Sequence, residues 1–218
     1  KHMEESRCAM NEWDLSLLFL INREWTNPFL DWFMCAISTI SAWTPVIAVL
    51  VLLAIWRHGK RGLLLVGCLI LAVVVSDSLV SYSLKKTVKR PRPTDSVLGV
   101  KVRSLARAKP DFMRLFLPPI ERDSTIKVSP DVPLSSRVGN SFPSSHTMNM
   151  FAVATVLAFY RRRLGWWMYG IAALVSYSRV YVGSHWPSDI PPSMGLGLLV
   201  GLAVAVLMQK LSRRWLAV

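Results

Sequence analysis

The fold is decided by residues 62–84, which read GLLLVGCLILAVVVSDSLVSYSL and carry a single charged side chain, Asp77. A helix needs about 20 mostly apolar residues to cross a hydrocarbon core of roughly 30 Å. In lipid, each backbone amide must find its hydrogen-bond partner inside the same helix. This stretch therefore predicts a membrane-spanning helix.

Four more apolar runs are long enough to form spans. They are Trp32 to Trp56, Phe142 to Tyr160, Leu164 to Ser178 extending toward Gly183, and Ile190 to Gln209. The preceding run, Asn11 to Leu30, mixes Trp, Leu and Phe with charges, which is typical of a helix lying in the membrane interface. The sequence predicts an all-α integral membrane bundle of five helices with an interfacial N-terminal helix. A sixth span in the N-terminal run is the alternative.

One membrane domain is the simplest organisation. Residues 1–3 are expected to be a cloning remnant, 4–31 an N-terminal interfacial segment, and 32–214 the membrane domain. A long extracytoplasmic loop is predicted at about 94–141, and within it Pro110 to Pro133 is expected to be irregular.

Composition and charge narrow the class of protein. The 218 residues are 52% hydrophobic, with a mean hydropathy of +0.37 and a net charge of +13. The cations lie in the gaps between apolar runs and form no basic face of a soluble fold, which argues against nucleic acid and favours lipid headgroups or phosphorylated substrates. Three cysteines without metal-ligand spacing predict neither a disulfide framework nor a zinc site.

Short basic loops predict the orientation. Arg57, Lys60 and Arg61, then Arg161 to Arg163, and finally Lys210, Arg213 and Arg214 mark one side as cytoplasmic. The 85–141 connection carries thirteen basic residues but falls on the opposite side. Long loops cross membranes largely regardless of charge, so the short loops decide.

Three polar clusters are predicted at the outer ends of three spans. The first is Lys85 to Pro93, KKTVKRPRP, either an anion clamp or a basic stop after a helix. In the second, Phe142 to His146, Ser144 and Ser145 can cap a helix whose free amides face an anion, and a histidine there can donate a proton. An ordinary helix start is the alternative.

The third cluster runs from Ser178 to Asp189. Arg179 is costly near the end of an apolar helix unless it serves a ligand, a partner or the interface. His185 and Asp189 are four residues apart, so a helical turn would set the carboxylate beside the imidazole and stabilise its charge during nucleophilic attack. A structural hydrogen bond is the alternative for the pair alone. Three clusters on one side favour a site.

These motifs together resemble the type 2 phosphatidic acid phosphatase family, shared with glucose-6-phosphatase and the vanadium haloperoxidases. The family pattern is K, six residues, RP; then PSGH; then SR, five residues, H, three residues, D. The chain matches with Lys85, Arg92 and Pro93, with Pro143 to His146 except at one position, and with Ser178 to Asp189.

The resemblance implies a metal-free and cofactor-free lipid phosphatase. It implies that His185 is the nucleophile, that Asp189 orients it, and that His146 protonates the leaving group and then activates water. The residues implied to hold the phosphate are Lys85, Arg92, Ser144, Ser145 and Arg179. Ser145 departs from the family glycine, and its side chain could crowd or hydrogen-bond the phosphate. Pro191 and Pro192 are a second departure, expected to kink or delay the last helix.

The expected substrate is a lipid-linked phosphate or diphosphate. Lipid A phosphate or undecaprenyl diphosphate is favoured, with phosphatidylglycerol phosphate and phosphatidate also open. The expected location is a bacterial inner membrane, with the site facing the periplasm or cell exterior. A lipid-to-lipid phosphotransferase and a non-catalytic lipid-binding or transport protein are the alternatives. The basic loop residues are expected either to grip a headgroup or to be solvated; they are Lys101, Arg103, Arg107, Lys109 and Arg114. The sequence leaves the oligomeric state open.

Overall fold

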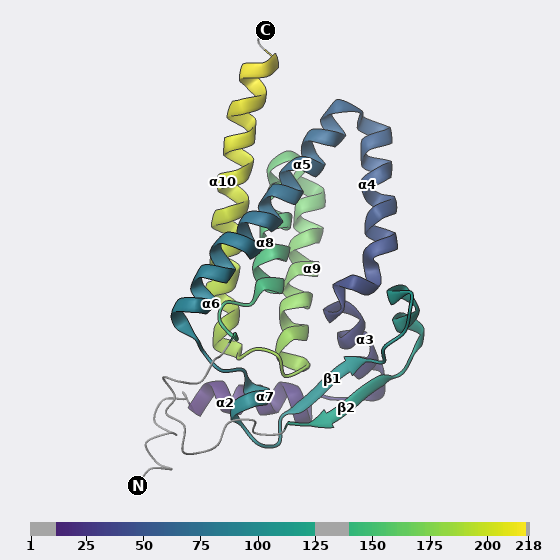
Figure 1. The fold of residues 1–218 in the computed structure, drawn as a ribbon, viewed down its shortest axis with the longest axis vertical. Coiled ribbons are helices and arrows are strands. Elements are labelled where there is room, and N and C mark those ends of the chain that lie inside the picture. Colours follow the sequence, from purple (N-terminus) through teal and green to yellow (C-terminus); the bar gives the residue numbers. More distant parts are fainter. Residues whose placement is uncertain (1–11, 125–139, 217–218) are drawn as a thin grey trace.

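The computed structural model describes residues 12–124 and 140–216, which form a helical bundle with a small β-hairpin at one end (Figure 1). The first part of the chain contains α2 (Glu12–Phe19), the π-helical turn η1 (Leu20–Glu24), α3 (Pro28–Ser38), the 3-10 turn η2 (Ile40–Trp43) and α4 (Thr44–His58). A long rod follows, made of α5 (Lys60–Val74), the π-helical η3 (Val75–Ser81) and α6 (Tyr82–Val88).

The connection to the second half holds α7 (Pro93–Ser96), β1 (Lys101–Leu105), the 3-10 turn η4 (Asp111–Phe116) and β2 (Pro119–Asp123). The second half contains α8 (Ser145–Tyr160), α9 (Arg162–Tyr181), the 3-10 turn η6 (Pro187–Asp189) and α10 (Ile190–Leu216). The expected cloning remnant, the start of the N-terminal segment and part of the long loop lie outside the described residues.

Three helical stretches in the described parts of the chain are long and apolar enough to cross a membrane. They are Ile40–His58, Lys60–Ser96 and Pro187–Leu211. The sequence also predicts spans at α8 and α9, which pack against each other in the bundle. Helix α8 has 16 residues, and α9 starts with two arginines. The protein is a helical integral membrane protein, and the number of five spans stays a prediction.

The span predicted from Trp32 to Trp56 is present as a candidate span over Ile40–His58, but its predicted start is wrong. Helix α3 ends at Ser38 and α4 begins at Thr44, with η2 between them. Pro45 stands in the first turn of α4, where its missing amide breaks no helical hydrogen bond. A hydrogen bond across the break stabilises it: the Trp43 indole donates to the Ala36 carbonyl at 2.9 Å. Proline here starts a helix and does not lie inside one.

Helix α2 lies across the end of the bundle that carries the hairpin (Figure 1). The helix predicted across Asn11 to Leu30 is interrupted, because Asn27 caps a new helix by accepting the Leu30 amide at 2.9 Å. The connections α4–α5 and α8–α9 and the last turns of α10 lie at the other end of the bundle. The short basic loops therefore share one end, as the sequence predicts.

Helices α8 and α10 approach closely because glycines face α8. A Cβ atom added at Gly197 would lie 2.4 Å from the Met148 carbonyl oxygen, and one at Gly201 would lie 2.6 Å from that of Ala152. Real Cβ atoms do not come this near, so these positions require glycine. Small residues four apart allow the same backbone-to-backbone contact between helices in membranes.

The second strand of a β-hairpin, β2, lies within Pro110 to Pro133, where the sequence predicts irregular structure, and there the prediction is wrong. Strands β1 and β2 pair antiparallel, with Lys101 opposite Asp123 and Leu105 opposite Pro119. Arg103 of β1 is buried and joins Asp31 of α3 at 3.0 Å and Glu121 of β2 at 2.8 Å. Tertiary ion pairs therefore hold a hairpin that has little apolar alternation of its own.

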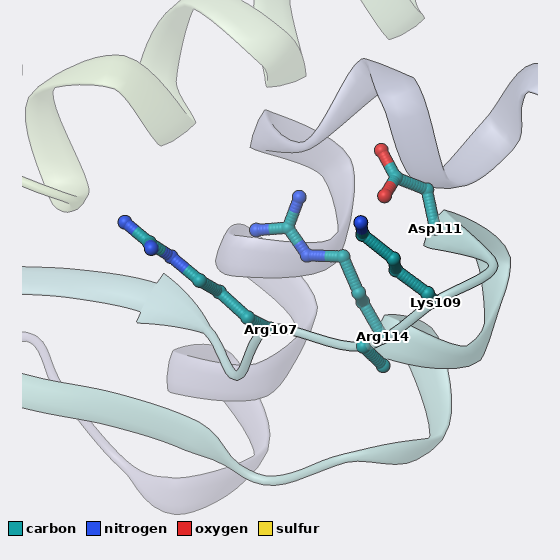
Figure 2. Close-up of a pocket in the computed structure, with 5 residues that line it drawn as sticks. Arg107, Lys109, Asp111 and Arg114 are labelled. Atoms are coloured by element: carbon teal, nitrogen blue, oxygen red, sulfur yellow. The ribbon is translucent and has the colours of Figure 1, made fainter.

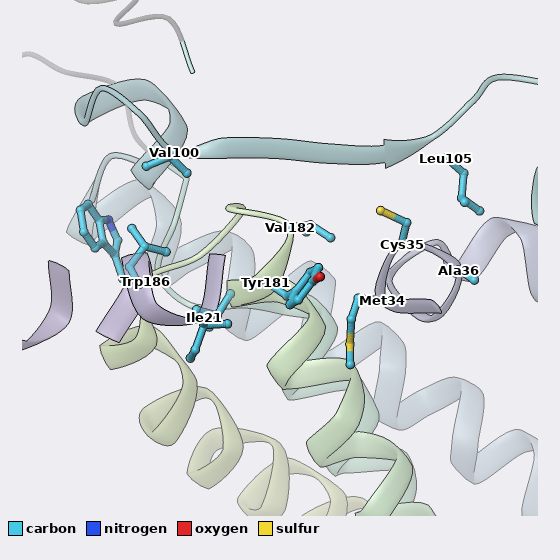
Figure 3. Close-up of a cluster of buried hydrophobic side chains, with 11 residues drawn as sticks. Ile21, Met34, Cys35, Ala36, Val100, Leu105, Tyr181, Val182 and Trp186 are labelled. Carbon is cyan, nitrogen blue, oxygen red and sulfur yellow. The ribbon is translucent and has the colours of Figure 1, made fainter. Parts of the chain in front are cut away.

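A hydrophobic cluster ties the hairpin, α2, α3 and the end of α9 together (Figure 3). Its largest fully buried side chains include Tyr181 and Trp186. Within it, Asn22 donates to the carbonyls of Tyr181 at 2.7 Å and Lys101 at 2.9 Å, and accepts the Lys101 amide at 2.7 Å. This packing fixes the turn that follows α9, where the polar clusters meet.

Candidate active site

His185 lies in the turn that follows α9. Gly183 makes the turn possible, because its φ is +77° and an added Cβ would lie 2.9 Å from the Lys101 carbonyl oxygen. The Ser184 amide then donates to the Arg179 carbonyl at 3.0 Å and closes the helix end. The turn buries the His185 side chain to 3% exposure, at the end of the bundle crossed by α2.

The imidazole of His185 has one fixed nitrogen. Its Nδ1 lies 2.6 Å from the backbone carbonyl oxygen of Ser141. A carbonyl can only accept a hydrogen bond, so this contact places the proton on Nδ1. The lone pair of Nε2 is left for another partner, which is the arrangement that a nucleophilic histidine needs.

Asp189 lies beside the ring but does not bond it directly. Its Oδ2 is 3.7 Å from His185 Nδ1, and the same oxygen accepts the Ser141 hydroxyl at 2.5 Å and the Trp186 amide at 3.1 Å. Ser141 therefore contacts both groups, through its carbonyl and its hydroxyl. The carboxylate stabilises the turn and places negative charge near the imidazole.

A buried charge network extends from Asp189 to the N-terminal helix. Arg90 donates from Nη1 to Asp189 Oδ1 at 2.5 Å and from Nη2 to Asp14 Oδ2 at 2.7 Å. Asp14, almost fully buried in α2, also accepts the Ser188 amide at 2.9 Å and the Ser188 hydroxyl at 2.5 Å. One guanidinium thus bridges two buried carboxylates and shares its single positive charge between them, while neutral hydroxyl and amide donors complete their hydrogen bonds.

Lys85 and Ser145 bring the first two clusters together. The Lys85 ammonium donates to Ser145 Oγ at 2.6 Å, and Ser145 Oγ lies 2.7 Å from the Ser81 hydroxyl. The side chain at the position of the family glycine thus accepts a hydrogen bond from the lysine. Lys85 keeps two further donors for an anion.

Arg92 and Arg179 have donors without partners. In the described residues, the Nε atom of each is buried and makes no hydrogen bond. Arg179 also donates from Nη1 to the hydroxyl of Ser38, at the end of α3. Buried donors are normally satisfied, and guanidinium groups match the geometry of phosphate oxygens. Both arginines are suited to hold an anion.

The start of α8 faces this cationic group. Ser144 is the N-cap residue, and its amide donates to Ser193 Oγ at 2.9 Å, which ties α8 to α10. His146 is the second residue of the helix and lies within electrostatic range of Arg179, His185, Lys85 and Arg92. The helix end adds free amides and the positive end of its dipole. The structure therefore gathers all three clusters at one end of the bundle.

The environment of His185 controls its protonation. Burial lowers the pKa of the imidazole, and the charges of Arg179 and Arg92 act in the same direction, while Asp189 opposes them. The ring is therefore neutral at pH values where a solvated histidine is already charged. A neutral ring with a free Nε2, beside cations that can hold phosphate oxygens, can attack phosphorus.

Three polar residues of the site are missed by motif reasoning. They are Asp14, Arg90 and Ser141. Arg90 lies inside the basic run Lys85 to Pro93, but nothing in its local pattern distinguishes it from Lys86 or Lys89. Its partners lie 76 and 99 residues away in sequence, so only the tertiary fold reveals the network.

Comparison with known proteins places these features in a family. The PAP2 superfamily model matches residues 61–213. The lipid A 4′-phosphatase of Porphyromonas gingivalis is 31% identical over 203 residues, covering 91% of this chain and 75% of that protein. The undecaprenyl-diphosphatase BcrC of Bacillus subtilis is 34% identical over 61 residues, covering 28% of this chain and 32% of that protein.

A solved structure shares the fold. Aquifex aeolicus LpxE superposes with a TM-score of 0.61 and 24% identity, covering 89% of this chain and 95% of that one. The family model extends from α5, through α6 and the basic run, to α10, and so includes all three polar clusters. The matched motifs, the buried histidine and the helical membrane fold agree, and the chain belongs to the PAP2 superfamily.

Proposed function

We propose that this protein is a membrane lipid phosphatase in which Nε2 of His185 attacks the phosphorus of a lipid-linked phosphate. The observation that carries the proposal is the contact between His185 Nδ1 and the Ser141 carbonyl, because it leaves Nε2 unprotonated. Arg92 and Arg179, whose Nε atoms make no hydrogen bond within the described residues, then hold the phosphate oxygens and balance the charge of the transition state.

The reaction has two steps. In the first, a bond forms between Nε2 and phosphorus, the bond from phosphorus to the lipid oxygen breaks, and His146 gives that oxygen a proton. In the second, His146 takes a proton from water, whose oxygen attacks phosphorus, and the bond to Nε2 breaks to release inorganic phosphate. Fixed cations supply the charge stabilisation throughout.

The proposed substrate is a phosphate on lipid A, with undecaprenyl diphosphate second. The lipid A 4′-phosphatase from Porphyromonas gingivalis aligns along nearly the whole chain, including the long loop, whereas the undecaprenyl-diphosphatase aligns over a short segment. The loop carries the hairpin and its cations, which supports a substrate with a large headgroup. Phosphatidate and phosphatidylglycerol phosphate are smaller alternatives.

A phosphate-release assay on purified lipids tests the reaction and the substrate together. The protein in detergent should release phosphate from lipid A without any acceptor lipid, and His185→Gln should reduce the rate at least about a thousandfold. Acid-quenched samples should contain an acid-labile, base-stable phosphoenzyme only when His185 is present. Release that depends on an acceptor lipid would indicate phosphotransfer, and unchanged release by His185→Gln would contradict the nucleophilic role.

The site is proposed to face the periplasm of a bacterial inner membrane. The short basic loops at the opposite end of the bundle support this orientation. Cysteines introduced at Ser104 on β1 and at Lys60 on α5 test it, in a background with Cys8→Ser; Cys35 and Cys68 are buried. An impermeant thiol reagent added to spheroplasts should label position 104 and leave position 60 unlabelled; the reverse pattern would invert the orientation.

A further inference from the structure

The turn between β1 and β2 carries an open cationic pocket, separate from the candidate active site. A cavity of about 440 Å³ is lined by Arg107, Ala108, Lys109, Asp111 and Arg114. Figure 2 shows the charged ends of Arg107, Lys109 and Arg114 rising from the same side of this turn, with Asp111 beside them. The volume is in the range of small-molecule sites, which is larger than a bare phosphate ion requires.

The pocket has a net positive charge, because its cations outnumber its carboxylate. It contains three cations and one carboxylate, and within the described residues none of the three cations makes an ion pair. In the part of the chain that the structure describes, Arg114 donates three long hydrogen bonds, at 3.4 Å to the Ala106 carbonyl, 3.5 Å to the Leu105 carbonyl and 3.4 Å to the Ser41 hydroxyl. Bonds of this length are weak, so the guanidinium remains available to an anion.

The pocket is held by the fold. Arg103 and Asn22 fix β1 to the bundle, and the Trp32 indole of α3 donates to the Leu115 carbonyl of η4 at 2.9 Å. The cations therefore project from an anchored scaffold. A preorganised site loses less conformational entropy when its ligand binds.

The pocket and the active site share a support. Arg179 of the active site donates to Ser38, at the end of α3, and Arg114 of the pocket donates to the Ser41 hydroxyl at 3.4 Å. Ser38 and Ser41 are three residues apart, across the break between α3 and α4. The two cationic sites therefore flank the same short turn.

The surroundings of the pocket favour a lipid ligand over a free ion. The side chains of Phe112 and Met113 in η4 are 38% and 44% exposed, and that of Phe116 is 77% exposed. Apolar side chains beside cations fit an amphiphile at a membrane surface. A free inorganic anion would gain nothing from contact with these apolar side chains.

We propose that the pocket binds a second anionic group, such as a second phosphate, of the lipid that is dephosphorylated at His185. The inference rests on the proposed function and narrows the substrate to lipids with two anionic groups. Binding of the second group would anchor the headgroup while the first reaches His185, so it acts on substrate affinity and leaves the chemical step unchanged.

The experiment compares one lipid in two forms, with two phosphates and with only the phosphate that is cleaved. The double variant Arg107→Gln with Lys109→Gln should raise KM for the bisphosphorylated form about tenfold, with kcat nearly unchanged. Its KM for the monophosphorylated form should stay within about twofold of the unmodified protein. Arg122→Gln is the matched control, because it removes an exposed cation from the same hairpin outside the pocket.

Several results would overturn the proposal. An equal rise in KM for both forms would indicate general attraction to anionic surfaces, and an effect of Arg122→Gln as large as that of the double variant would indicate the same. Competition by phosphatidylglycerol, added to the micelles, that is lost in the double variant would assign the pocket to bulk anionic lipid, and such competition by inorganic phosphate would assign it to a free ion. If the unmodified protein releases no phosphate from either form, the proposed function itself fails.

Discussion

Arg90 and Asp189 meet at 2.5 Å, through a guanidinium nitrogen and an oxygen of the carboxylate that lies beside His185. The other end of the same guanidinium holds Asp14, in a helix that lies across the end of the bundle. The carboxylate that stabilises the turn around His185 is therefore itself positioned from two sides. Arg90 touches no reacting atom in the proposed mechanism and acts through Asp189.

Replacing Arg90 by Gln should reduce kcat about ten- to a hundredfold and leave KM within about threefold, because Asp189 loses its fixed position while the phosphate cations remain. Arg90→Lys should restore part of the loss by returning the charge without the two-ended fork. Lys86→Gln, an exposed neighbour, is the control. A rise in KM with unchanged kcat would instead place Arg90 among the phosphate-binding residues.

Asp14 should act through the same guanidinium. Asp14→Asn alone should lower kcat, but it should add little to the loss already caused by Arg90→Gln, since residues in one network are not additive. Steady-state kinetics of the two single variants and the double variant measure this coupling. Independent, multiplying losses would show that Asp14 has a separate role, such as holding Ser188.

His146 should be needed for both steps of the reaction, but not equally for every substrate. With an activated aryl phosphate, the leaving group departs without a proton, so His146→Gln should still form the phosphohistidine and then hydrolyse it slowly. Rapid acid- and base-quench measurements should find phosphoenzyme accumulating in this variant and none in His185→Gln. Equal and complete absence in both variants would contradict the assigned roles.

The pH dependence follows from the environment of His185. Attack requires the neutral ring, and burial lowers its pKa, so the neutral form persists to lower pH than in a solvated histidine. The acidic limb of kcat/KM should therefore lie below 6.5, the ordinary value. Asp189 raises this pKa, so Asp189→Asn should move the limb further toward acid as well as slow the reaction. Rates measured between about pH 4 and 8 test both signs.

Ser145 should assist the site because its hydroxyl holds the Lys85 ammonium. Ser145→Ala removes that contact and the one to Ser81, and kcat/KM should fall about fivefold, mainly through KM. Ser145→Thr, which keeps the hydroxyl, is the comparison. An increase in kcat/KM on removing the hydroxyl would show that it competes with phosphate for Lys85.

The sequence predicts well what is local. Long apolar runs predict membrane helices, and short motifs predict Lys85, His146 and His185 as site residues. Each of these signals is contained in one continuous stretch of sequence. Pro45 is also a local signal, but the prediction follows the continuous hydropathy of the segment and therefore misses the helix break before this proline. The hairpin is different, since β1 has charged residues and β2 begins with proline, and its pairing depends on Arg103 reaching Asp31 and Glu121.

The supporting residues of the site cannot be predicted from the sequence either, because they act through contacts with residues that are distant in sequence. Ser141 precedes the second motif, yet its value lies in contacts 44 and 48 residues away, to His185 and Asp189. Asp14 meets Ser188 across 174 residues. Helical periodicity cannot report such contacts, because they arise when separate elements pack end to end.

The glycine at position 197 determines more than helix packing. Its missing side chain lets α10 rest on the Met148 backbone, two residues after His146, while Asp189 immediately precedes α10. The spacing between His146, the proposed proton donor, and Asp189, proposed to position the nucleophile, therefore depends on direct contact between the backbones of α8 and α10. A methyl group added at position 197 would push α10 away from α8 and shift Asp189 relative to His146.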